Sequence, residues 1–158
     1  MKISISDLTT SLNFVNCMWY SKKNSKISYP EHGNKDCFEV EDKSYWIVHR
    51  NIILGHVINR YYDGKPFFDV GGGSGYVSKA LQDLGIDAYL IEPGIQVIKN
   101  AENRGVTNLI NSSLQDCHFK RCTIFNIGLF DVLEHIDDDS GFLETINKLL
   151  TVNGKVFV

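Results

Sequence analysis

Glycine is concentrated at one point of the chain, in a pattern suited to holding a ligand against bare backbone. Gly71, Gly72, Gly73 and Gly75 follow Asp69 and the apolar run "PFFDV". A turn of this kind, between a buried strand and the helix after it, brings backbone N–H groups close to a bound molecule. The segment therefore predicts a ligand site where this strand ends, and a tight turn without a ligand is the plainer alternative.

The spacing of the glycines separates two classes of ligand. Dinucleotide-binding folds need G-x-G-x-x-G, so that a pyrophosphate can sit on the helix N-terminus. This chain has G-x-G-x-G, and Tyr76 stands where the third glycine of that fingerprint belongs. A side chain there would push strand and helix apart, which argues against a nicotinamide-dependent oxidoreductase. The other class of ligand has no pyrophosphate and carries a ribose and a methionine-like tail.

A carboxylate follows the next predicted strand. Glu92 ends the run "AYLIE". At the tip of a second strand, an acid can accept hydrogen bonds from both hydroxyls of a ribose, and it disfavours a 2′-phosphate. A solvated surface glutamate is the plainer alternative, but the pairing with the glycine turn favours a ribose contact.

The elements around these residues follow from hydrophobic periodicity. After the glycines, Val77, Ala80, Leu81 and Leu84 recur at helical spacing, and Gly85 ends the helix. Further helices are predicted in "EDKSYWIVHRNIILGHVINRYYDG", "GIQVIKNAENRG" and "SGFLETINKLL". Strands are predicted in "PFFDV", "AYLIE", "TNLIN", "TIFNIGLF" and "GKVFV". This alternation is typical of an α/β fold with a Rossmann-like, doubly wound, mostly parallel sheet and flanking helices.

Composition divides the chain into two parts. Residues 1–40 are polar and rich in lysine, serine and asparagine, which predicts an irregular N-terminal arm. Residues 41–158 carry the predicted elements and form the ligand-binding domain. The whole chain has 158 residues, 43% of them hydrophobic and 22% charged, which suits one core.

Together, the motifs resemble the class I S-adenosylmethionine-dependent methyltransferases. The matching stretches are "FFDVGGGSGYVSKAL", "YLIEPG", "NLINSSLQD" and "FNIGLFDVLEHIDDD", in order and spacing. The last of these, with "FLETINKLLTVNGKVFV", is similar to the branch of the family that acts on small molecules. The resemblance implies methyl transfer from S-adenosylmethionine to a small-molecule or saccharide-like acceptor, with S-adenosylhomocysteine as product.

The resemblance also implies roles for matching residues. Asp69, Gly71, Gly73 and Gly75 would surround the methionine portion of the cofactor. Glu92 would bind the ribose, with Pro93 against the adenine. The remaining positions implied as cofactor contacts are Ser113 and Leu114 at the adenine edge, Leu129 and Phe130 at the methionine end, and Trp46 and Arg50 at the mouth of the site.

The chemistry of such a site needs few catalytic side chains. Since the cofactor carries an activated methyl group, the protein has to align a nucleophile and exclude water. An oxygen acceptor would need a general base, and His135 in "LEHIDDD" is the candidate. A structural hydrogen bond at a helix start is the alternative role. No metal is expected, because "CHFKRC" lacks the paired spacing and fourth ligand of a zinc site.

The resemblance further implies that two strands are missing. Complete members of the family have seven strands, and "GKVFV" begins only the fifth. The chain is therefore predicted to be truncated after its fifth strand, with strands 6 and 7 absent, and the exposed edge of the fifth strand would allow self-association. A second hypothesis follows, in which the chain binds the cofactor without turning over by itself.

Net charge and targeting signals limit the classes of partner and the location that we expect. The net charge is −3, which argues against a nucleic-acid partner. No apolar run reaches the roughly 20 residues of a membrane span, and no signal peptide is recognised. A cytoplasmic location is expected, and the four cysteines are predicted to be reduced thiols.

Overall fold

The centre of the molecule is a parallel sheet built from the short apolar runs of the sequence. The computed structural model describes residues 3–22 and 44–158. All five predicted strands form, as β3 (Phe67–Val70), β4 (Ala88–Ile91), β5 (Leu109–Asn111), β6 (Ile124–Gly128) and β7 (Leu150–Phe157). Every residue of β3, β4 and β5 is buried, because helices cover both faces of the sheet, so these strands read as continuous apolar runs.

The N-terminal residues extend this sheet. Helix α1 (Ile5–Leu8) is followed by the antiparallel pair β1 (Leu12–Val15) and β2 (Met18–Ser21), and β2 pairs in parallel with β5. The predicted irregular arm is therefore wrong for residues 5–21. Residues 23–40, and the predicted domain boundary at residue 40, lie outside the described residues. The signal that was missed is the pair of short apolar and aromatic runs, "LNFV" and "MWY", on the two sides of Asn16 and Cys17.

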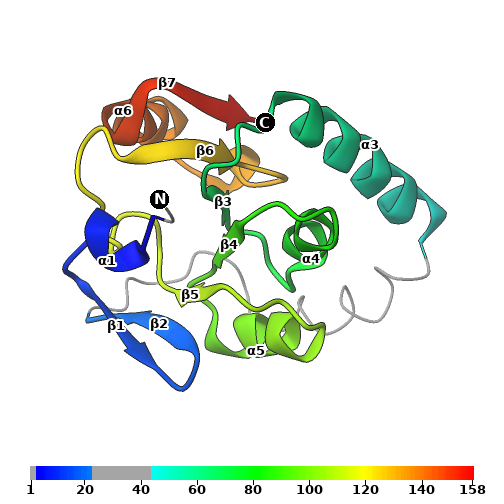
Figure 1. Ribbon diagram of the computed structural model, residues 1–158, viewed down its shortest axis with the longest axis horizontal. Helices are drawn as coiled ribbons and strands as arrows, with labels where there is room; N and C mark the ends of the chain where they lie inside the picture. The colour runs from blue at the N-terminus through cyan, green and yellow to red at the C-terminus, as the bar shows by residue number, and fades with distance from the viewer. Residues whose placement is uncertain (1–2, 23–43) are drawn as a thin grey trace.

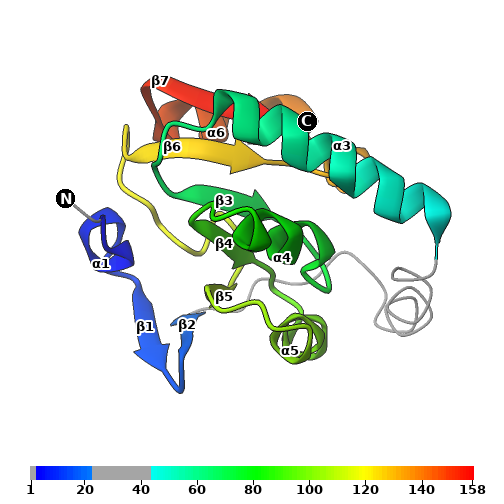
Figure 2. The same cartoon turned by 45° about the vertical axis from the view of Figure 1, so that its right-hand side comes forward.

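The sheet has seven strands in the order β1-β2-β5-β4-β3-β6-β7 (Figure 1). The prediction of a sheet truncated after its fifth strand, with strands 6 and 7 absent, was therefore wrong. The physical reason is the hairpin. Its two strands take the sheet beyond β5, on the side away from β7, and the count from the sequence left them out. Figure 2 shows β1 and β2 at one end of the sheet and β7 at the other.

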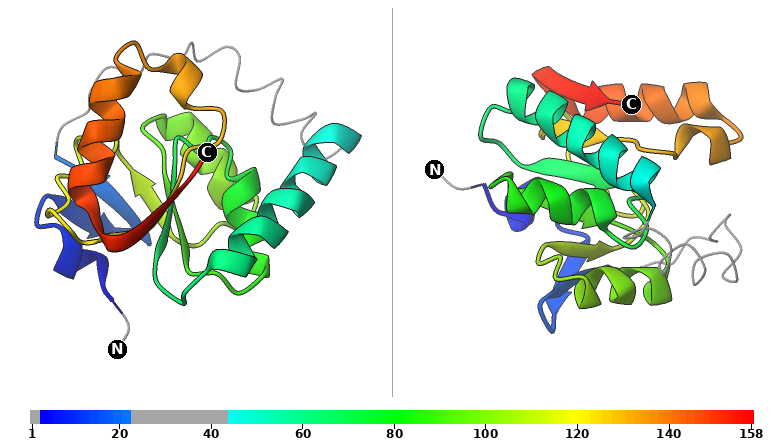
Figure 3. Two further views of the ribbon diagram at one scale, coloured as in Figure 1. Left: turned by 90° about the horizontal axis from the view of Figure 1, so that it is seen from above. Right: turned by 90° about the vertical axis from the view of Figure 1, so that its right-hand side faces the viewer.

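The helices cover the sheet in two layers. The helices α3 (Tyr45–Tyr61), α4 (Tyr76–Asp83) and α5 (Ile95–Asn103) lie on one face, and α1 and α6 (Asp139–Leu149) lie on the other (Figure 3). Successive residues of β3 point to opposite faces of the sheet. Phe67 belongs to the hydrophobic cluster that contains Ile58 and Leu81. Phe68 belongs to the cluster that contains Phe142 and Ile146. No helix in the described ranges is both long and apolar enough to cross a bilayer.

The strand order of the sheet reverses next to β3. From β3 it moves through β4 to β5, and then it returns to β6 and β7 on the other side of β3. In open α/β sheets, ligands bind at the carboxyl ends of the strands where the order reverses. The fold therefore places the glycine turn after β3 and the segment after β6 side by side at the edge of the sheet where such ligands bind.

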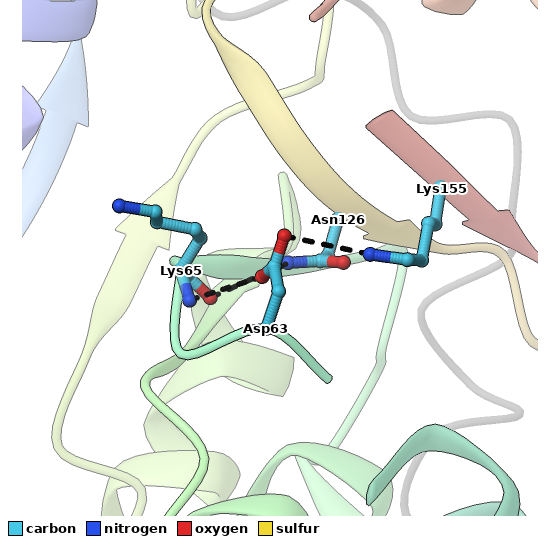
Figure 4. A network of polar contacts seen from close by, with 4 residues as sticks. All are labelled: Asp63, Lys65, Asn126 and Lys155. Atoms are coloured by element: carbon cyan, nitrogen blue, oxygen red, sulfur yellow. Dashed lines mark hydrogen bonds and ion pairs between the residues drawn. The ribbon is translucent and has the colours of Figure 1, made fainter. Parts of the chain in front are cut away.

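A largely exposed polar network around the buried side chain of Asn126 fixes the opposite end of the same strands (Figure 4). Asn126, in β6, donates a hydrogen bond of 3.0 Å to Asp63 Oδ1, and Lys155 Nζ of β7 donates one of 3.4 Å to Asp63 Oδ2. Burial acts to raise the pKa of Asp63, but its hydrogen bonds and the charge of Lys155 outweigh burial and lower that pKa. The network ties the loop before β3 to β6 and β7.

Candidate functional site

The turn after β3 presents backbone to open space at the carboxyl edge of the sheet. Gly73 has a φ of +56°, and a Cβ added to it would meet no atom within 4 Å. Gly75 has a φ of +75°, and a Cβ added there would lie 2.8 Å from the Cβ of Ala101 on α5. Gly71 completes the turn, and its N–H donates to the carbonyl of Ile91 at 2.8 Å. Glycine at 75 lets α5 pack closely, whereas glycine at 73 leaves room for a ligand.

Asp69, in β3, is a buried carboxylate with only one oxygen satisfied. Its Oδ2 accepts a hydrogen bond of 2.6 Å from Ser78 Oγ on α4. Its Oδ1 has no hydrogen-bond partner among the residues that the structure describes. Burial raises the pKa of Asp69 to about 6, while the hydrogen bonds from Ser78 and the charge of Arg50 act to lower it. One acidic oxygen is thus left for a donor that a ligand would supply.

Glu92 follows β4 and is also buried. Its Oε1 accepts a hydrogen bond of 2.7 Å from the N–H of Gly94. Burial raises the pKa of Glu92, the hydrogen bonds from the amides of Gly94 and Gly73 lower it, and the negative charge of Asp69 raises it further. The carboxylate therefore lies against the glycine turn, close enough to Asp69 for the two charges to repel each other.

The predicted adenine edge is held by local hydrogen bonds. Asn111 Nδ2 donates to the carbonyl of Pro93 at 3.0 Å, which joins the ends of β4 and β5. Ser113 Oγ donates to Asp116 Oδ2 at 2.9 Å, so its hydroxyl caps a turn. Leu114 is buried in the core. The structure brings Pro93 and Ser113 to the same edge as Glu92, and their contact with an adenine stays a prediction.

The segment after β6 contributes its side chains to the core. Leu129 is 1% exposed and packs among the side chains on the α6 face of the sheet. The ring of Phe130 stacks on that of Phe67, with centroids 6.5 Å apart, on the opposite face. The predicted contacts of Leu129 and Phe130 with the methionine end of the cofactor stay predictions.

Arg50 reaches the site from α3. Its Nη2 lies 2.7 Å from Asp131 Oδ2, just beyond β6. The guanidinium also lies 5.5 Å from the centre of the Trp46 ring, one turn earlier on the helix. Arg50 is thus placed at the predicted mouth of the site, close enough to Asp69 to act on its pKa. Trp46 stands beside it and is 65% exposed.

The candidate base lies on a short 3-10 helix, η1 (Leu133–His135). His135 is exposed, and η1 follows the left-handed residue Asp131, whose φ is +57°. The next acidic residues begin α6, where Asp138 Oδ1 accepts a hydrogen bond of 3.0 Å from the N–H of Gly141. Asp138 is therefore the N-cap of α6, a position where a negative charge stabilises the helix.

Two residues of the site, Ser78 and Asn51, were missed by the sequence reasoning. Ser78 Oγ donates the hydrogen bond that holds Asp69. Asn51, on α3, is 6% exposed, and neither polar atom of its side chain has a hydrogen-bond partner in the described part of the chain. Asn51 could have been noticed in the sequence, because it is a polar residue beside the apolar stripe of a predicted helix.

The two cysteines of "CHFKRC" lie in different environments. Cys117 is buried, which raises the pKa of its thiol to about 12, whereas Cys122 is exposed. Within residues 3–22 and 44–158, no group of three His, Cys, Asp or Glu side chains is placed to hold a metal ion.

Relatives of known structure share this fold. A protein from Methanococcus maripaludis, solved as a candidate S-adenosyl-L-methionine-dependent methyltransferase, superposes with a TM-score of 0.65 over 85% of this chain and 65% of that chain, at 18% identity. A protein from Pyrococcus horikoshii gives a TM-score of 0.66 over 82% of this chain and 62% of its own, at 17% identity.

Sequence comparison assigns the family. A ubiquinone biosynthesis O-methyltransferase from Caulobacter vibrioides is 27% identical over 103 residues, and the match covers 61% of this chain and 41% of that protein. This chain therefore spans less than half of that relative's length. The sequence model of a family described as "Methyltransferase domain" matches residues 38–158, most of the chain. The chain belongs to this methyltransferase domain family.

Proposed function

We propose that this chain binds S-adenosylmethionine at the carboxyl edge of the sheet and supports transfer of its methyl group to a small-molecule acceptor. The observation that carries the proposal is the pair of buried carboxylates beside an open glycine turn. Burial raises the pKa values of both Asp69 and Glu92, so a ligand that brings positive charge or hydrogen-bond donors would stabilise their charged forms.

The two acids favour a ligand with positive charge and hydrogen-bond donors. S-adenosylmethionine carries an ammonium, a sulfonium and a ribose diol, all of which suit a pair of acids. A nicotinamide dinucleotide carries a negatively charged pyrophosphate, which the same acids repel. The ring of Tyr76, at the position of the third fingerprint glycine, lies under the guanidinium of Arg104 at 4.8 Å. Both observations favour the methyl donor over NAD.

Each residue has a proposed task in that complex. Asp69 Oδ1 accepts a hydrogen bond from the amino acid end of the cofactor, and Glu92 accepts from the ribose hydroxyls, since a carboxylate offers about four lone-pair sites. The backbone at Gly73 allows close approach. Arg50 balances the negative charge of the site and closes its mouth with Trp46.

The cofactor, when bound, supplies an activated methyl group. The protein then has to hold the acceptor in line and exclude water, and alignment of this kind can supply about 7–11 kcal/mol. His135 is the proposed base for an oxygen acceptor. Its exposed place on η1, at the same edge as Asp131, leaves it accessible to an acceptor that enters from solvent. The name of the Caulobacter relative supports an oxygen acceptor.

Calorimetric titration with S-adenosylhomocysteine, and with NAD in parallel, tests the proposal. We expect S-adenosylhomocysteine alone to bind. Binding of NAD alone would overturn the proposal and restore the oxidoreductase hypothesis. If S-adenosylhomocysteine binds but no methyl transfer follows with S-adenosylmethionine and a panel of small acceptors, the chain acts as a cofactor-binding module.

A further inference from the structure

A groove on α3 lies next to the proposed cofactor site and shares Trp46 and Arg50 with the mouth of that site. Its volume is about 270 Å³, and it is lined by Tyr45, Trp46, His49, Arg50, Ile53 and Leu54. We infer that this groove binds the acceptor, and that the acceptor carries a planar aromatic ring. The inference rests on the proposed function, because it identifies the substrate class of the same site.

The lining of the groove selects for flat, apolar groups. Tyr45 and Trp46 are 82% and 65% exposed, which is unusual for large aromatic side chains on the same turn of a helix. The rings of Tyr45 and His49 stack with an interplanar angle of 7°. Aromatic surfaces of this kind hold planar rings by stacking and apolar burial. A saccharide, which needs several hydrogen-bonding groups, finds few in this lining.

Charge favours a neutral acceptor. Among the described residues that line the groove, the one full positive charge is that of Arg50, which is already paired with Asp131 at 2.7 Å. An anionic acceptor would have to break this ion pair, and a cationic one would meet Arg50 itself. A neutral aromatic ring meets neither cost.

Size and position are consistent with this assignment. An apolar cavity of about 150 Å³ is enough to hold benzene. The groove therefore has room for a substituted ring. Arg50 lines the groove, and its charge also acts on Asp69, so this part of the groove lies near the cofactor edge of the sheet. A larger cavity of about 670 Å³, lined by Trp19, Phe14 and the start of β5, lies at the other edge of the sheet.

The two tryptophans of the chain report on the two cavities separately. Trp46 lines the groove on α3, and Trp19 lines the larger cavity. We would label the protein with 5-fluorotryptophan, assign the two ¹⁹F signals with Trp46→Phe, and titrate with 2-naphthol under saturating S-adenosylhomocysteine. A saturable shift of the Trp46 signal is expected. A shift of the Trp19 signal alone, or of neither signal, would overturn the inference.

Two matched comparisons sharpen the test. Ile52 and Ile53 are both 51% exposed, but only Ile53 lines the groove. Ile53→Asp should raise the dissociation constant of 2-naphthol by about tenfold or more, because it removes apolar contact area, and Ile52→Asp should leave it within about twofold. Equal effects of both variants would contradict the inference. Decahydro-2-naphthol and methyl glucoside should bind at least about tenfold more weakly, and equal binding of either would overturn the aromatic assignment.

The same samples separate the two proposals. If S-adenosylhomocysteine binds and 2-naphthol does not, the acceptor inference fails while the proposed function stands. If S-adenosylhomocysteine itself does not bind to the wild-type chain, the proposed function fails, whatever happens at the groove.

Discussion

Arg50 and Asp131 form an ion pair of 2.7 Å between α3 and the segment after β6. The two residues are far apart in the sequence and come from different layers of the molecule. Arg50 Nη2 is held by a carboxylate whose own backbone is left-handed, with a φ of +57°. The pair fixes the position of a positive charge at the edge where two buried acids, Asp69 and Glu92, have raised pKa values.

Removal of this charge should weaken cofactor binding. We expect Arg50→Gln to lower the affinity for S-adenosylhomocysteine by about 10-fold or more, since a hydrogen bond to a charged group is worth about 1.5–3 kcal/mol. Because the charge of Arg50 lowers the pKa of Asp69, the pH below which binding weakens should also move upward. Calorimetry from pH 5 to pH 8 measures both effects. Arg60→Gln, at the far end of α3, is the control and should change neither.

Asp69 should make the fold less stable as pH rises. Its pKa is raised from 3.8 to about 6, so the folded chain binds the proton more tightly than the unfolded chain does. The contribution to the free energy of unfolding is therefore present below about pH 4 and lost by about pH 6, with a total on the order of 3 kcal/mol. Asp69→Asn should remove this slope in urea unfolding. The same slope in wild type and variant would contradict the assignment, and the exposed Asp137→Asn is the control.

Glu92 should contribute to cofactor binding more than to stability. Glu92→Ala is expected to weaken binding of S-adenosylhomocysteine by about 2–4 kcal/mol, through the loss of two charge-assisted hydrogen bonds to the ribose. Calorimetry measures this loss. Glu102→Ala removes an exposed acid from α5 and should leave the affinity unchanged. Unaltered affinity in a folded Glu92→Ala protein would refute the ribose contact.

Gly73 should tolerate no side chain in the complex. Gly73 and Gly64 both have positive φ values, +56° and +76°, and a Cβ at either would meet no protein atom within 4 Å. Valine at either position should therefore lower the free energy of unfolding by a similar amount, about 1–2 kcal/mol. Only Gly73→Val should abolish binding of S-adenosylhomocysteine, because only Gly73 faces the proposed ligand. Retained binding in Gly73→Val would show that the turn faces elsewhere.

The stability of the fold should depend on Asn126 as an uncharged hydrogen-bond donor. Asn126→Asp would place a second carboxylate beside Asp63, where the amide now donates a hydrogen bond of 3.0 Å. We expect a loss of at least about 3 kcal/mol in unfolding free energy at neutral pH, and a smaller loss in acid, where one carboxyl binds a proton. Thermal unfolding at pH 5 and pH 8 tests this. Asn153→Asp, on an exposed site of β7, should cost little at either pH.

The parallel core of the fold could be predicted from the sequence, because local signals there agree with each other. Apolar runs gave β3 to β7, and the glycines at 85 and 105 end their helices with positive φ values of 80° and 91°. The hairpin was missed because its turn lacks glycine. Asn16 and Cys17 adopt φ values of 48° and 64°, the conformation for which Asn-Gly is the usual signal, and cysteine concealed it.

The site was predictable only in part. The spacing of Asp69, the glycines and Glu92 placed them on one edge, because the carboxyl ends of parallel strands meet there. The hydrogen bond from Ser78 to Asp69 and the ion pair of Asp131 with Arg50 were not predictable, since each pair meets only once helix and loop are folded against the sheet. The apolar run "TIFNIGLF" indicates burial of Leu129 and Phe130, as observed, whereas their cofactor contacts were implied only by the resemblance.

The pairing of β2 with β5 has a consequence for the order of folding. Met18 lies opposite Leu109, so the chain must close a loop that includes β3, β4 and, in its described part, the helices α3, α4 and α5 before this pair can form. The hairpin itself needs only local contacts, which form within about 1–10 μs. Docking onto β5 is therefore a late step, and until it occurs the apolar edge of β5 remains open to strands of other molecules.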